Sequence, residues 1–136
     1  MAETKKKLLY VNRKAPHGTI YALEGLEVVL IGAAFEQDVS IAFLDDGVYQ
    51  LLDGQDTAAI GAKNFSRSYK ALGDFEVRKV YVERESLSER GLAASELMQI
   101  TYEDENEDGA EKPLIQLVDR RDLAQIMSEQ DVILSF

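Results

Sequence analysis

Short apolar runs of strand length alternate with segments of helical spacing along this chain, and that alternation limits its possible folds most strongly. The first run, 7–12 (KLLYVN), is bounded by charged residues, as expected of a strand buried on both faces. The next segment, 20–35, keeps its apolar residues at the spacing of a helix. Strands that alternate with helices predict a mostly parallel sheet with both faces covered. We therefore predict a single domain over 1–136, a three-layer α/β/α sandwich.

The other expected elements complete a five-stranded sheet. Asp119 has the side chain of a helix cap and is predicted to start a helix that ends near Glu129. The segment 57–73 has helical spacing that breaks at Gly61 and Asn64, and a short helix is expected after Asp46. Strands are predicted at 7–12, 39–44, 77–82, 114–118 and 131–136.

Three local patterns predict how these elements pack and end. Gly25 and Gly32 lower helix propensity, which close packing of the helix against a sheet or a partner helix would explain. Ser86 and Glu89 have the spacing of a capping box. The strand 131–136 ends the chain, and its side chains are predicted to lie in the core.

Composition excludes several classes of function. The chain has 136 residues, of which 46% are hydrophobic, and a formal net charge of −10. A surface of that sign repels phosphate backbones, so no nucleic acid is expected as a direct partner. No apolar run approaches the ~20 residues of a membrane helix, and the N-terminus is interpreted as a first strand and not a signal peptide. We expect a cytoplasmic chain without a membrane anchor.

The chain contains no cysteine and a single histidine, His17. Disulfides, thiolate zinc sites, iron–sulfur ligation and thiol nucleophiles are therefore impossible. We predict no catalytic residue, no cofactor and no metal ion. The sequence "DENEDG" at 104–109 matches the first half of a calcium loop, but Ile115 stands where the bidentate glutamate belongs. The acidic residues of 103–111 instead indicate a solvated segment.

The loop 14–19 (KAPHGT) occupies the place where α/β proteins often bind phosphate. It lacks the further glycines of a dinucleotide fingerprint and the Gly-Lys pair of a Walker loop. One alternative is a flavodoxin-like small-molecule or phosphate-binding enzyme, with a site at His17, Gly18, Asp45 and Asp46. The other alternative is a loop histidine that makes a structural or interface contact.

Four sequence blocks together resemble one family: "NRKAPHGTIYALEGLEVVLIGAAF", "FLDDGVYQLLDGQ", "YKALGDFEVRKVYVERESLSERGL" and the final "DVILSF". They occur in the order expected of the DsrE/DsrF/TusC family and most resemble its DsrF (TusC-like) subunit type. The resemblance implies an α/β/α fold with a five-stranded parallel sheet. It also implies a cytoplasmic heterohexamer with DsrE-type and DsrH-type sister subunits, which passes persulfide sulfur to a DsrC-type carrier. The pathway implied is dissimilatory sulfur oxidation or, for the TusC type, tRNA 2-thiolation.

In the DsrE-type sister subunit, the active cysteine lies near the end of the strand before the x-R-G turn. The matching region here is 81–85 (YVERE), which contains no sulfur. A persulfide needs a thiolate to accept and hold the sulfur. The resemblance therefore implies a non-catalytic structural subunit. Its candidate interface or vestigial-site residues are Pro16, His17, Gly18, Asp46, Tyr49, Glu83 and Arg84.

Overall fold

Five parallel strands form the centre of the molecule. The computed structural model describes residues 6–17, 21–34, 37–53, 69, 72, 77, 79–104 and 107–136. The strand order is β6-β3-β2-β1-β7, and each neighbouring pair is parallel. The predicted five-stranded sheet is confirmed, with each strand within two residues of its expected bounds. The strands are β1 (Lys7–Asn12), β2 (Asp38–Phe43), β3 (Lys79–Glu83), β6 (Ile115–Val118) and β7 (Val132–Ser135).

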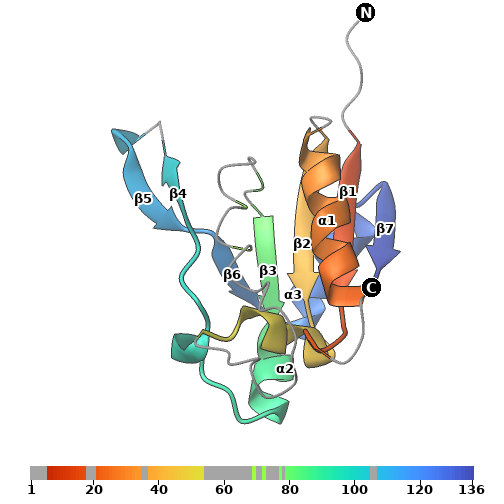
Figure 1. Cartoon of the computed structure of the whole chain (residues 1–136), viewed down its shortest axis with the longest axis vertical. Coiled ribbons are helices and arrows are strands. Elements are labelled where there is room, and N and C mark those ends of the chain that lie inside the picture. Colours follow the sequence, from red (N-terminus) through yellow and green to blue (C-terminus); the bar gives the residue numbers. More distant parts are fainter. Residues whose placement is uncertain are drawn as a thin grey trace, which may run out of the picture.

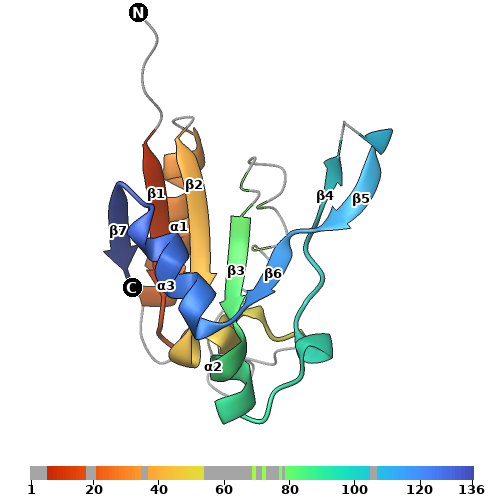
Figure 2. The same cartoon turned by 180° about the vertical axis from the view of Figure 1, so that it is seen from behind.

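Helices cover both faces of this sheet and produce the three predicted layers. Helix α1 (Tyr21–Ala34) lies on one face, and α3 (Arg120–Ser128) lies on the other (Figures 1 and 2). The Asp119 carboxylate accepts from the Asp122 N–H at 2.8 Å, which confirms the predicted cap of α3. Among the described residues, no helix is long and apolar enough to cross a membrane.

Two glycines bring α1 close to β1. A Cβ added at Gly25 would lie 2.8 Å from Asn12 Oδ1, and one at Gly32 would lie 2.6 Å from the Tyr10 hydroxyl oxygen. Both distances are shorter than a side chain tolerates, so the predicted close packing is confirmed. It explains why a strand-covering helix retains two residues of low helix propensity.

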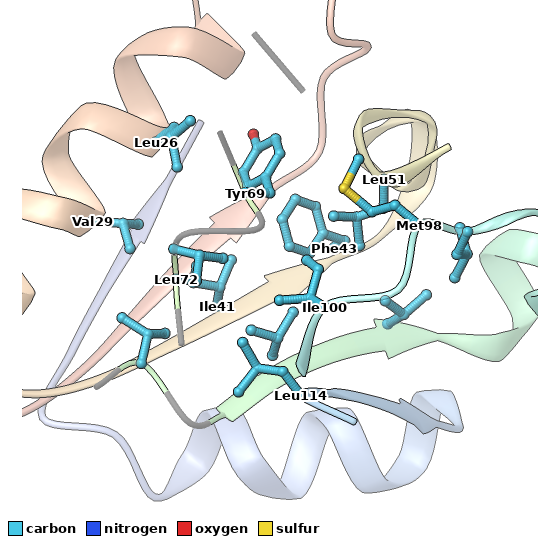
Figure 3. Close-up of a cluster of buried hydrophobic side chains, with 14 of the residues drawn as sticks. Leu26, Val29, Ile41, Phe43, Leu51, Tyr69, Leu72, Met98, Ile100 and Leu114 are labelled. Atoms are coloured by element: carbon cyan, nitrogen blue, oxygen red, sulfur yellow. The ribbon is translucent and has the colours of Figure 1, made fainter. Parts of the chain in front are cut away.

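Alternating side chains of the strands divide the core into two parts. Tyr10 and Ile41 point towards α1, whereas Leu9 and Ala42 point towards Leu123 of α3. The larger part, between the sheet and α1, includes Tyr69 packed edge-on against Phe43 with ring centroids 5.5 Å apart (Figure 3). Figure 3 also labels its other main members, Leu26, Val29, Leu51, Leu72, Met98, Ile100 and Leu114.

The connections at the carboxyl ends of the strands are short. Residues after β2 form the 3-10 helix η1 (Asp45–Leu51), where a short helix was expected. Helix α2 (Arg84–Glu89) follows β3 directly, and the 3-10 turn η4 (Ala94–Glu96) follows α2. The predicted capping box is wrong, because Ser86 lies inside α2 and Glu83 is its N-cap residue. Most of the predicted helical segment 57–73 lies outside the described residues.

A two-stranded hairpin was not expected from the sequence. Strands β4 (Thr101–Asp104) and β5 (Ala110–Pro113) pair antiparallel and project from the body of the molecule (Figures 1 and 2). Glu103 and residues 107–111 are exposed, as predicted for a solvated segment, but the two ends of the acidic stretch belong to this hairpin. Asp108 and Gly109 have φ angles of +56° and +74°, so two consecutive left-handed residues reverse the chain.

The prediction for the last strand is also wrong in one respect. Strand β7 forms as expected, but it lies at the edge of the sheet, and all four of its residues are exposed. A terminal strand in the middle of the sheet would have been covered by helices on both faces. At the edge, α1 and α3 do not cover the β7 side chains, which are therefore exposed to solvent.

Candidate site at the carboxyl edge of the sheet

The carboxyl ends of parallel strands meet at one edge, and charged side chains from four connections gather there. Arg13 follows β1, Asp45 follows β2, Glu83 ends β3 and Arg120 follows β6. Ser86 of α2 connects two of them by hydrogen bonds. We call these five residues the strand-end network.

Asp45 has a backbone conformation that the network stabilises. Its φ angle of +52° lies in the left-handed region, which costs free energy for a residue other than glycine. Its N–H donates to Ser86 Oγ at 2.8 Å, and its carboxylate binds Arg13 Nε at 2.9 Å. The turn after β2 is thereby bound both to α2 and to the residue that follows β1.

Glu83 is the buried member of the network. Its side chain is 4% exposed, yet its Oε1 atom accepts from Ser86 Oγ at 2.7 Å and from Arg120 Nη2 at 3.1 Å. The same Arg120 nitrogen binds the exposed carboxylate of Glu89 at 3.1 Å. Hydrogen bonds to Glu83 and then to Glu89 raise the pKa of Arg120. A buried carboxylate thus has both a neutral donor and a cationic partner.

The 3-10 helix η1 joins this edge to the loop after β1. Arg90 Nε binds Asp46 Oδ1 at 3.1 Å, and Gln50 Nε2 donates to the Lys14 carbonyl at 2.8 Å. The buried Tyr69 hydroxyl donates to Gln50 Oε1. A Cβ at Gly47 would lie 1.8 Å from the Asn12 carbonyl oxygen, so only glycine fits there. These contacts fix η1 against the end of β1.

A hollow of about 450 Å³ opens beside Glu83. Its walls combine the network with an apolar side formed by α3, and they consist of Leu44, Asp45, Glu83, Glu89, Arg120, Leu123, Ala124 and Met127. The acidic groups of this hollow include Asp45 and Glu83, which are bound to arginines within the protein. In the part of the chain that the structure describes, no cluster of His, Asp and Glu side chains is placed to hold a metal ion.

The predicted site residues lie in three places. Pro16 is buried and His17 is half-buried in the loop after β1, and Gly18 lies outside the described residues. Asp46 and Tyr49 belong to η1, where Asp46 is exposed and bound to Arg90.

Glu83 and Arg84, by contrast, lie at the junction of β3 and α2, where Glu83 is buried and Arg84 is exposed. Arg84 Nη2 lies 3.4 Å from the Leu117 carbonyl oxygen. Asp45 and Asp46, which the alternative site combines with His17, are each bound to an arginine.

Two members of the strand-end network, Ser86 and Arg120, were not among the predicted site residues. The sequence places Ser86 only in a predicted capping box and Arg120 only in the helix predicted after Asp119. The one available signal was positional: Arg120 and Glu83 each stand at a strand end in a parallel sheet, where such residues meet.

Comparisons with known proteins identify the family of this chain. The sequence pattern of the DsrE/DsrF-like family matches residues 6–136. The chain is 54% identical to the intracellular sulfur oxidation protein DsrF of Allochromatium vinosum, over the full length of both chains. It is 38% identical to a TusC homolog of Vibrio parahaemolyticus over 92 residues, which cover 68% of this chain and 78% of that one.

A solved structure supports the fold independently. The crystal structure of the ychN protein from Escherichia coli superposes with a TM-score of 0.72, covering 96% of this chain and 99% of that one. Their sequence identity is 22%, so this likeness concerns the fold alone. With the family match over nearly the whole sequence and a full-length relative above half identity, the chain belongs to the DsrE/DsrF-like family.

Proposed function

We propose that this chain is a non-catalytic subunit of a cytoplasmic sulfur-relay complex. In this proposal it forms a heterohexamer with DsrE-type and DsrH-type sister subunits, and the complex passes persulfide sulfur to a DsrC-type carrier. The observation that carries the proposal is the end of β3. There a buried glutamate, bound by Ser86 and Arg120, occupies the region in which the family resemblance implies the active cysteine of the sister subunit.

The chemistry of sulfur transfer supports a role without catalysis. A relay accepts sulfane sulfur on a thiolate, holds it as a persulfide and passes it to another thiolate. This chain has no cysteine, and a methionine thioether cannot form a persulfide. The Glu83 carboxylate is moreover occupied by its two donors. The sulfur-carrying residue must therefore belong to a sister chain.

Two relatives favour different pathways. The DsrF protein of Allochromatium vinosum matches over the full length of both chains, which favours sulfur oxidation. The TusC protein of Escherichia coli matches at 39% identity over 87 residues, or 64% of this chain, which favours tRNA 2-thiolation. The longer and closer match makes sulfur oxidation the first choice and the TusC-type relay the alternative.

Co-expression with the two sister chains tests the assembly. We expect this chain to elute with both sisters in size-exclusion chromatography, and the complex to transfer labelled sulfane sulfur to the carrier. The isolated chain is expected to retain no label after gel filtration. A chain that remains alone beside both sisters, or that binds labelled sulfur covalently by itself, would contradict the proposal.

A deletion strain separates the two pathways. Loss of sulfur oxidation with normal tRNA 2-thiouridine supports the sulfur-oxidation role. Loss of 2-thiouridine with normal sulfur oxidation supports the TusC-type role instead.

A further inference from the structure

The exposed large apolar side chains of the described residues are confined to two elements. Ile31 of α1 is 58% exposed, and Val132, Ile133 and Leu134 of β7 are 38%, 45% and 40% exposed. We call these four residues the β7-edge patch. Single exposed apolar residues are common on protein surfaces, but a group of them beside one strand marks an interaction surface.

The register of β7 places apolar groups on both faces of the edge. Val132 and Leu134 lie beside Leu8 and Tyr10 of β1 and so face the α1 side. Ile133 lies beside Leu9 and faces the α3 side. Among the described strands, none pairs with the outer side of β7, and Figures 1 and 2 show no coloured segment beyond it. A free apolar strand edge is a surface to which another chain can add.

Helix α1 adds Ile31 to the same surface. Gly25 and Gly32 face β1, and Leu26 belongs to the same buried cluster as Tyr69. At about 100° per residue, Ile31 lies on the opposite flank of the helix from Leu26. Since Tyr69 packs on Phe43 of β2, that opposite flank is the one towards β7.

A second copy of this chain is a poor fit to the β7-edge patch. If β7 pairs antiparallel with β7 of a second copy, the two-fold axis is perpendicular to the sheet. The two copies of α1 then lie side by side on the same face of the joined sheet. The exposed carboxylates of Glu24 and Glu27 would then repel their copies, and the segment 21–34 has no lysine or arginine to neutralise them. Each chain also has a net charge of −10.

We propose that the β7-edge patch binds a different chain, a sister subunit that presents an apolar strand edge bordered by lysine or arginine residues opposite Glu24 and Glu27. This inference rests on the proposed function and adds which surface of this chain the sister subunit contacts. Apolar burial supplies the affinity, and the charge match excludes a second copy.

The test compares two charge insertions in the complex with co-expressed sister chains. Ile133→Glu and Ile31→Glu are expected to weaken binding to the sister chains at least about tenfold. Gln116→Glu is the matched control, because it adds the same charge at an exposed position of β6, the strand at the opposite edge of the sheet. Denaturation of each isolated variant shows whether it is folded. In hydrogen exchange, the outward-facing amides of 132–135 are expected to become protected when the wild-type complex forms.

Distinct outcomes separate this inference from the proposed function. If the wild type binds the sisters and both patch variants bind equally well, the patch is overturned while the proposed function stands. If the wild type ignores the sisters, both are overturned. A chain that is a homodimer on its own, and that Ile133→Glu makes monomeric, overturns the choice of partner.

The charge part of the inference has its own test. Replacing Glu24 and Glu27 with glutamine should slow association with the sister chains and reduce its dependence on salt. An unchanged salt dependence would exclude the basic border on the partner.

Discussion

At the carboxyl ends of β1, β2 and β3, charged side chains are bound to one another, whereas along β7 large apolar side chains remain exposed. The first region is where parallel α/β proteins usually bind ligands. In this chain its buried carboxylate, Glu83, is already paired with Arg120. The second region is where the core was expected, and it meets solvent. The difference supports the proposal that this chain contributes an interaction surface and that the sulfur chemistry belongs to sister chains.

The largest effect is expected where η1 touches the end of β1. Gly47→Ala would place a methyl group 1.8 Å from the Asn12 carbonyl oxygen, so it should cost about 4 kcal/mol or more of unfolding free energy, or prevent folding. Gly91→Ala is the control, because its Cβ would meet no atom within 4 Å. Its φ angle of +67° still makes that change cost about 1–2 kcal/mol. Equal losses in urea denaturation would show that the carboxyl edge is not tightly packed.

A pair of glutamates tests the strand-end network. Glu83 and Glu89 bind the same Arg120 nitrogen at 3.1 Å, but Glu83 is 4% exposed and Glu89 is 57% exposed. Glu83→Ala should cost about 2 kcal/mol, because it removes one buried and one partly buried hydrogen bond to a charged group. Glu89→Ala should change stability by less than about 0.5 kcal/mol. Chemical denaturation of both variants measures the difference, and equal costs would contradict a special role for the buried carboxylate.

Alkaline pH tests the hydrogen bond between Tyr69 and η1. Burial raises the pKa of the Tyr69 hydroxyl above its ordinary value of 10.0. The unfolded chain therefore releases this proton first, and the stability from the neutral hydroxyl is present below pH 10 and lost as pH rises above it. One such group lowers unfolding free energy by up to about 1.4 kcal/mol per pH unit. Burial also raises the pKa of Tyr10 and Tyr81, so some dependence should persist in Tyr69→Phe.

The measurement is the slope of unfolding free energy against pH between about pH 9 and pH 11. Tyr69→Phe should be less stable than the wild type at neutral pH, since Gln50 loses its donor. Its slope above pH 10 should be shallower. Identical slopes would show that burial does not raise the pKa of the Tyr69 hydroxyl.

The smallest effect is expected at the single histidine. His17→Ala should change stability by less than about 1 kcal/mol and leave folding intact, because His17 is only half-buried in a loop. In the complex it should at most weaken assembly or carrier docking, and Lys14→Ala in the same loop is the control. If the His17→Ala complex loses sulfur transfer while its assembly and carrier docking are unchanged, the carboxyl edge of the sheet has a catalytic role.

The sequence by itself determined the layers, the parallel strands and the close approach of α1. Apolar runs and helical spacing depend on the geometry of a single strand or helix. The glycines at 25 and 32 depend only on the contact between one helix and one neighbouring strand. The absence of cysteine also settled from composition alone that this chain cannot hold a persulfide.

Only the tertiary structure decided which strand lies at the edge and which charges meet. Strand order depends on contacts between distant residues, such as Glu83 with Arg120 and Ser86 with Asp45, and no local pattern specifies those partners. The same holds for β7, whose sequence is as apolar as that of a central strand. Its exposure follows from its position in the sheet, because burial is a property of the assembled layers and not of the strand.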